Sequence, residues 1–151
     1  HYHFVDIPRF EAMVANGEFL EHARVFGNFY GTSAASVRHE LQRGADVVLE
    51  IDWQGARQVR EAKPDCITVF ILPPTREELE RRLRSRGTDS EAVIERRLRD
   101  ALSDMSHWDE FDYVIVNDDL DRAVADLEAV IAGHGAAHAT DNPNNVHWSL
   151  T

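Results

Sequence analysis

The chain has 151 residues, a length that predicts one domain, and its 43% hydrophobic content is enough to bury a core. A formal net charge of −11 argues against nonspecific nucleic-acid binding, which needs a basic surface. One cysteine excludes an internal disulfide, and no apolar run reaches the roughly 18 residues that a membrane-spanning helix needs. We therefore expect a cytoplasmic protein with no nucleic-acid or membrane partner.

Apolar spacing and turn residues predict an alternation of helices and strands. In chain order, the expected elements are a helix over 7–16, a strand over 19–25 with a return strand from 29, a helix over 34–43, a strand over 46–52, a helix over 54–62, a strand over 66–72, helices over 75–85 and 91–105, a strand over 112–116 and a helix over 120–131. The three later strands are separated by helices, which favours right-handed crossovers and a buried parallel sheet. The first thirty residues predict a small antiparallel insert instead.

Short polar residues mark the expected helix starts. Asp6 is predicted to cap the first helix, with Pro8 in its first turn. Either Thr32 or Ser33 is predicted to cap the second helix, and Ser90 the long helix that follows it in the second half. Residues 133–151 have no clear periodicity and are expected to form a loosely ordered tail.

Three carboxylates are candidates for ligand binding. Glu50 and Asp52 follow a Val-Val-Leu run at the carboxyl end of a predicted strand, where open α/β sheets bind ligands. The alternative is that one of them only caps the next helix. On simple alternation, Glu21 shares a strand face with Phe19, where it would accept hydrogen bonds from a ligand or, equally, be an edge-strand charge facing water.

Tyr2 and Tyr30 flank the predicted hairpin, and each hydroxyl could reach a phosphate oxygen. From the residues alone, packing of two partly buried rings is the favoured alternative. No zinc-binding histidine spacing and no serine nucleophile elbow occurs in the sequence, and Cys66 is expected to lie in the core.

Arginine dominates the basic residues, and Lys63 is the one lysine. Seven arginines fall between positions 81 and 99, where Arg82 and Arg86 share one side of a helix end and Arg97 lies on the next helix. Two helices that present guanidinium groups are typical of a lid that closes on phosphates, because arginine binds phosphate oxygens in pairs. The alternative is a surface of ion pairs with neighbouring glutamates.

Five stretches together resemble the guanylate kinase family, in its bacterial form. They are FLEHA with FGNFYGT (19–32), LEIDWQGA (49–56), ILPP (71–74), RLRSRG (82–87) and VIVNDD (114–119). The resemblance covers residues 1–132. It implies an α/β, P-loop-kinase-like parallel sheet flanked by helices, with a GMP-binding region over 1–45 and a helical lid over 84–99.

The resemblance also implies roles by matching position. Glu21 and Asp52 would read N1 and N2 of guanine, Thr32 would donate to O6, and Tyr2 and Tyr30 would hold the GMP phosphate. The ATP phosphates would be covered by Arg82, Arg86 and Arg97, Asn117 would lie beside adenine, and Glu50 would contact Mg²⁺ through water. The implied reaction is transfer of the γ-phosphate of ATP, as its Mg²⁺ complex, to GMP in purine nucleotide metabolism.

One departure from the family pattern matters. The Gly-rich phosphate loop, G-x-x-G-x-G-K-[ST], does not occur in these 151 residues. We expect these residues to belong to a longer native enzyme and to give little turnover by themselves. The alternatives are a catalytically inactive module that binds a nucleotide or a peptide, and a kinase for a different nucleoside monophosphate.

Overall fold

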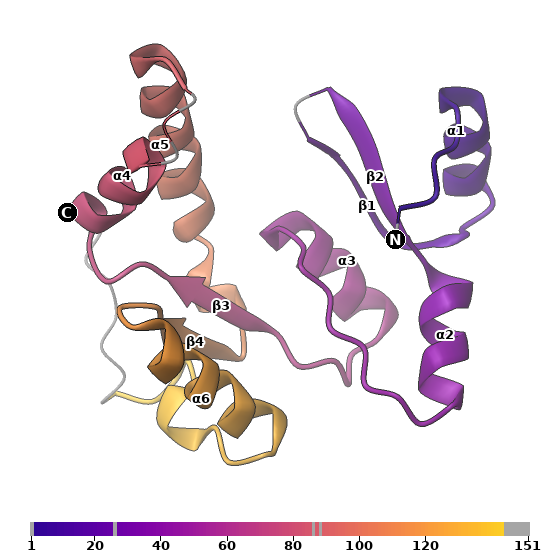
Figure 1. The fold of residues 1–151 in the computed structure, drawn as a ribbon. Helices are drawn as coiled ribbons and strands as arrows, with labels where there is room; N and C mark the ends of the chain where they lie inside the picture. The colour runs from indigo at the N-terminus through magenta and orange to yellow at the C-terminus, as the bar shows by residue number, and fades with distance from the viewer. Residues whose placement is uncertain (1, 26, 86, 88, 144–151) are drawn as a thin grey trace. The chain divides into compact units, whose positions relative to one another are not determined.

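The computed structural model describes residues 2–25, 27–85, 87 and 89–143. The chain divides into two compact units, residues 1–66 and 67–151. Each unit has helices and a two-stranded sheet of its own (Figure 1). The antiparallel insert and the parallel sheet that the sequence predicts fall in different units.

An antiparallel hairpin organises the first unit. Its strands are β1 (Phe19–Val25) and β2 (Asn28–Ser33), and its helices are α1 (Ile7–Ala15), α2 (Ala34–Gln42) and α3 (Trp53–Ala62). All three helices contact β1 (Figure 1). The predicted cap is confirmed at α1, because the Asp6 side chain accepts from the Arg9 N–H at 2.9 Å. At α2, Ser33 and not Thr32 is the capping residue.

A β-bulge between Phe19 and Glu21 decides which side chains share a face of the hairpin. Phe19 pairs with Ser33, whereas Glu21 pairs with Thr32, so β1 advances two residues while β2 advances one. The prediction from simple alternation is therefore wrong for this pair. The extra residue moves Phe19 and Glu21 to opposite faces.

An aromatic cluster covers the face that carries Phe19. The ring centroid of Phe10, in α1, lies 4.8 Å from that of Phe19 and 5.3 Å from that of Phe29. Phe19 also packs across Gly31, where an added Cβ would lie 2.6 Å from Cδ1 of the ring. Since a carbon cannot occupy that space, Gly31 lets the ring reach α1 and leaves the other face of the hairpin to Glu21.

A parallel pair of strands forms the centre of the second unit. The strands are β3 (Val69–Leu72) and β4 (Tyr113–Val116), and the helices are α4 (Arg76–Ser85), α5 (Glu91–Met105), α6 (Leu120–Ile131) and the short η1 (Trp108–Glu110) and η2 (Ala136–His138). Val114 packs with Leu72 and Met105, while its neighbour Ile115 packs with α6. Because successive strand side chains point to opposite faces, β4 is buried on both sides, as the sequence predicts for a parallel sheet.

Two predicted strands differ from the structure. Residues 46–52 form no strand, and Val48 is 71% exposed. An apolar run becomes a strand only when a neighbour supplies its ladder hydrogen bonds, and none of the described strands pairs with this segment. For the same reason the strand predicted over 66–72 is confined to β3, the part that pairs with β4.

Two further expectations meet a different outcome. Ser90 precedes α5 as predicted but makes no side-chain capping bond; its carbonyl accepts from Val93 and Ile94 instead. In the segment expected to be a loose tail, η2 is ordered, and Thr140 donates its N–H to the Asp112 carbonyl at 3.0 Å. Residues 144–151 lie outside the described residues.

Candidate functional site

A buried carboxylate lies on the hairpin face opposite the aromatic cluster. Glu21 is only 6% exposed, which excludes the alternative of an edge-strand charge facing water. Its Oε1 accepts a hydrogen bond from the Thr32 hydroxyl at 2.6 Å. A carboxylate has room for about four hydrogen bonds, and a buried one is costly without them. The geometry therefore fits a ligand that brings N–H donors to Glu21.

The first turn of α3 lies against this carboxylate. An ideal Cβ at Gly55 would be 3.0 Å from Oε2 of Glu21, so the glycine leaves space that the carboxylate fills. Asp52 caps the same turn, because its Oδ1 accepts from the Gly55 N–H at 2.8 Å. Asp52 thus caps the helix, as one of the two interpretations predicts, and its second oxygen retains the capacity to accept from a ligand.

The two tyrosines lie together on this unit. The Tyr2 and Tyr30 rings make an edge contact with centroids 6.3 Å apart. They are 78% and 42% exposed, so the interpretation as partly buried packing residues does not hold for Tyr2. Tyr30 shares a face of β2 with Thr32, the residue that binds Glu21. Unit 1 therefore brings together five predicted site residues: Tyr2, Glu21, Tyr30, Thr32 and Asp52.

Substitution of Gly55 by alanine is expected to weaken ligand binding while the protein still folds. Alanine favours a helix over glycine by about 1 kcal/mol, which offsets the close contact of the new methyl with Cβ of Ile51, 3.2 Å away, so we expect the melting temperature to change little. The new methyl would press on Glu21, and we expect binding of any ligand that this carboxylate reads to weaken about tenfold. Thermal denaturation and ligand titration of the same sample measure both effects. A variant that binds as well as the unchanged chain would contradict this assignment of Gly55.

The second unit positions the arginines. Nε of Arg82, in α4, lies 2.6 Å from Oε1 of Glu78, and its Nη2 donates to the Asn117 carbonyl at 3.0 Å. Asn117 follows β4 and donates its N–H to the Leu72 carbonyl at 2.7 Å, which extends the parallel ladder. The structure thus brings together Arg82 and Asn117, two residues that the family resemblance assigns to ATP.

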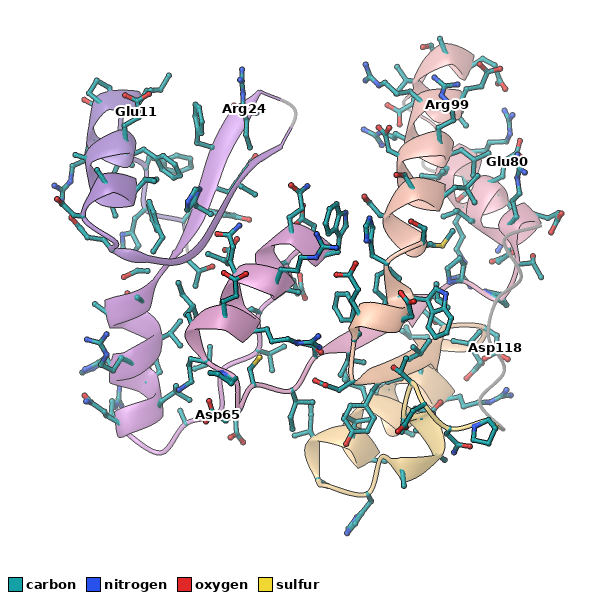
Figure 2. All side chains as sticks on the ribbon, turned by 180° about the vertical axis from the view of Figure 1, so that it is seen from behind. Glu11, Arg24, Asp65, Glu80, Arg99 and Asp118 are labelled. Atoms are coloured by element: carbon teal, nitrogen blue, oxygen red, sulfur yellow. The ribbon has the colours of Figure 1, made fainter. Side chains whose placement is uncertain are left out.

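Arg97 lies in α5. Nη1 of Arg97 is 2.8 Å from Oδ2 of Asp89. Arg82 therefore has a glutamate partner, as the ion-pair alternative predicts, whereas Arg97 pairs with an aspartate that this alternative did not include. Each guanidinium has five N–H donors and keeps donors for a phosphate beside its ion pair. Arg86 lies outside the described residues. Charged side chains, including Glu80 and Arg99, cover this pair of helices (Figure 2).

An ion-pair network joins the two helices. Arg84 contacts Glu80 within α4 and Glu91 at the start of α5. The hydrogen bonds that Arg84 donates to Glu91, and after them those that it donates to Glu80, raise the pKa of Arg84, and the hydrogen bond from Arg84 lowers the pKa of Glu91. Because these groups are at the surface, the network contributes little stability but fixes charge across the turn.

Glu78 is expected to stay ionised at pH values well below the ordinary glutamate pKa. Hydrogen bonds from Arg81, and next from Arg82, lower its pKa to about 2. A lowered pKa stabilises the fold above the unfolded value, near 4.5, and this contribution is lost as the pH falls toward 2. Carboxyl-carbon NMR should give a midpoint near 2 for Glu78, and Arg81→Ala should raise it. A midpoint in the ordinary glutamate range would contradict this geometry.

Three residues that contribute to the site were not predicted from the sequence. Gly55 acts by the absence of a side chain, Gln58 binds the backbone of β1, and Asp89 pairs with Arg97. Each effect depends on contacts between separate elements, and no spacing rule signals them. In the part of the chain that the structure describes, no three His, Cys, Asp or Glu side chains gather as a metal site.

The comparisons with known proteins agree on one family. The guanylate kinase family model matches residues 1–134, which is most of the chain and includes residues of both units. The chain belongs to the guanylate kinase family. The α/β fold and the family inferred from the five motifs are thereby confirmed.

Individual relatives carry the same name. The chain is 61% identical over 134 residues to guanylate kinase of Alkalilimnicola ehrlichii, covering 89% of this chain and 66% of the relative. It is 56% identical over 131 residues to that of Vibrio vulnificus, covering 87% and 63%. It therefore spans less than two thirds of the length of both relatives.

A solved structure supports the same membership. The crystal structure of guanylate kinase from Anaplasma phagocytophilum matches with a TM-score of 0.71 and 35% identity, over 89% of this chain and 65% of that one. Among the described residues of this family member, no helix combines the length and the apolar character needed to cross a membrane.

Proposed function

We propose that this protein takes part in ATP-dependent phosphorylation of GMP, with GDP and ADP as products. The observation that carries the proposal is the buried Glu21 carboxylate, which receives one hydrogen bond, from Thr32, among the described residues. Guanine presents N1–H and N2–H₂ donors, and adenine presents no N1–H. Adenine would therefore leave the carboxylate buried without its partner, and this difference supports selection of GMP over AMP.

Neighbouring residues would complete the GMP site. Asp52 would accept from N2, and Tyr2 and Tyr30 would hold the phosphate with their hydroxyls. Thr32 presents a conflict, because the proton it would donate to O6 is donated to Glu21. Donation to O6 therefore requires the hydroxyl to rotate, and until then Thr32 holds the carboxylate in place.

The second unit supplies groups for ATP. Arg82, Arg86 and Arg97 would bind its phosphates, and Asn117 would lie beside adenine. The reaction joins a GMP phosphate oxygen to the γ-phosphorus and breaks the bond to the β-phosphate oxygen, which leaves with ADP. The protein has no covalent step to perform, so its arginines act by neutralising charge and by orienting the phosphates.

Mg²⁺ enters the proposal as part of the ATP substrate. Glu50 is exposed two residues before Asp52, and no cluster of three acidic, histidine or cysteine ligands occurs among the described residues. This donor set fits a cation that is held by phosphates and water, with Glu50 as an outer contact, as is usual for Mg²⁺. The proposal places the protein in the cytoplasm, where its single cysteine stays reduced.

Titration of the 151-residue chain with GMP, AMP and dTMP tests the substrate. We expect GMP to bind and AMP to bind about 100-fold more weakly, and a chain with no preference for GMP would overturn the proposal. Turnover is to be measured in a form that also carries the family's phosphate loop. GMP binding with no turnover in that form would support an inactive binding module instead.

A further inference from the structure

We propose that Gln58 is a positioning residue, which holds Glu21 in the geometry that reads guanine. This inference rests on the proposed function, since it needs Glu21 to accept from the base. It starts from the exposed edge of β1. The hairpin has two strands, so β1 pairs with β2 on one side only. A strand edge leaves N–H and C=O groups without a ladder partner.

The side chain of Gln58 takes the place of a neighbouring strand. Its Oε1 accepts from the His22 N–H at 3.0 Å, and its Nε2 donates to the His22 carbonyl at 3.0 Å. A primary amide has the same donor and acceptor as a peptide group, so one side chain satisfies both backbone groups.

The contact between Gln58 and His22 lies next to Glu21, the residue proposed to select guanine. His22 follows Glu21 directly, and the β-bulge that turns Glu21 away from Phe19 lies just before it. A bulge interrupts the ladder and leaves the strand locally less constrained. The Gln58 amide therefore fixes the backbone on one side of Glu21, and the Thr32 hydroxyl fixes the carboxylate itself.

The same contact ties together the elements that carry both proposed guanine-reading carboxylates. Gln58 is in α3, the helix that Asp52 caps, and α3 packs against β1. A shift of β1 along α3 would change the spacing between Glu21 and Asp52, and would also close the space left by Gly55. Two hydrogen bonds to one residue oppose that shift. We infer that Gln58 sets the distance between the two carboxylates.

The test compares GMP with IMP, which lacks the 2-amino group but keeps N1–H. Gln58→Met keeps the length of the side chain and removes both hydrogen bonds. We expect GMP to bind about tenfold more weakly and IMP about threefold or less, so that the preference for GMP shrinks. Gln58→Glu keeps the acceptor for the His22 N–H and loses the donor, and we expect an intermediate effect.

The control is Gln42→Met, the same chemical change at the exposed end of α2, where the side chain of Gln42 makes no hydrogen bond to the described residues. It should leave both affinities unchanged. Amide hydrogen exchange of His22 reports directly on its hydrogen bond to Gln58. The exchange should become faster in Gln58→Met but not in Gln42→Met.

Two outcomes would overturn the inference. One is faster exchange at His22 with an unchanged ratio of GMP to IMP affinity, which would make the contact merely structural. The other is loss of the cooperative unfolding transition in Gln58→Met together with unchanged nucleotide affinities in Gln58→Glu. Failure of the unchanged chain to bind GMP would instead refute the proposed function. GMP binding by the unchanged chain is therefore measured before any variant is made.

Discussion

Replacement of Glu21 by glutamine is expected to weaken GMP binding about 100-fold, or ~2.7 kcal/mol. Glutamine has nearly the same size, so the change tests charge and hydrogen bonding without opening a cavity. Its amide accepts at one atom only, and its NH₂ group would face a guanine N–H with no acceptor between them. AMP binding should change little, since adenine offers no N1–H. The selectivity for GMP should therefore fall by nearly the same factor.

Glu11→Gln is the matched control, because Glu11 is exposed on α1 of the same unit (Figure 2). We expect it to bind GMP like the unchanged chain. Thermal unfolding of both variants shows whether the fold persists. If Glu21→Gln binds GMP with unchanged affinity, the assignment of the buried carboxylate to guanine is wrong, whatever its burial.

Replacement of Arg97 by alanine is expected to act on turnover instead of on GMP. In a form that carries the family's phosphate loop, we expect kcat to fall at least about 100-fold, while the KM for GMP changes less than threefold. An interaction made mainly in the transition state lowers kcat and kcat/KM together. Arginine over transferring phosphates acts in this way, since the charge it meets develops during transfer.

Two variants make the Arg97 test specific. Arg99→Ala removes an exposed guanidinium two positions further along α5 and should leave kcat unchanged (Figure 2). Asp89→Asn weakens the ion pair of Arg97 while the guanidinium stays in place, so it should retain turnover. Equal losses of turnover and of GMP affinity in Arg97→Ala would place the residue outside the phosphate-binding machinery.

Sequence patterns predicted helix boundaries well, because a helix boundary depends on residues close together in the chain. Asp6 caps α1 and Ile131 ends α6 as expected, because capping and apolar periodicity depend on a few neighbouring residues. The predicted strand over 46–52 is absent because its existence depends on a ladder partner elsewhere in space. Strand register failed at Glu21 for a related reason, since a bulge is a property of two strands together.

The candidate site was predictable as a set of residues but not as a geometry. Family motifs singled out Glu21, Thr32 and Asp52; the structure joins Thr32 to Glu21 on the hairpin and places Asp52 at the first turn of α3, whose Gly55 faces Glu21. The Thr32–Glu21 hydrogen bond and the two hydrogen bonds between Gln58 and His22 depend on packing between β1, β2 and α3. No single segment of the sequence encodes that packing. For the arginines, the residues alone left phosphate binding and ion pairs open, and the structure shows the ion pairs.

The most direct measurement is an amide NMR titration of the 151-residue chain with GMP. We expect the shifts to concentrate in unit 1, over residues 20–23, 30–32 and 52–58, and α6 not to respond. This result would place the base at Glu21 and the first turn of α3. Shifts concentrated in residues 67–143, or equal responses to GMP and AMP, would mean that the hairpin and α3 do not form the guanine site.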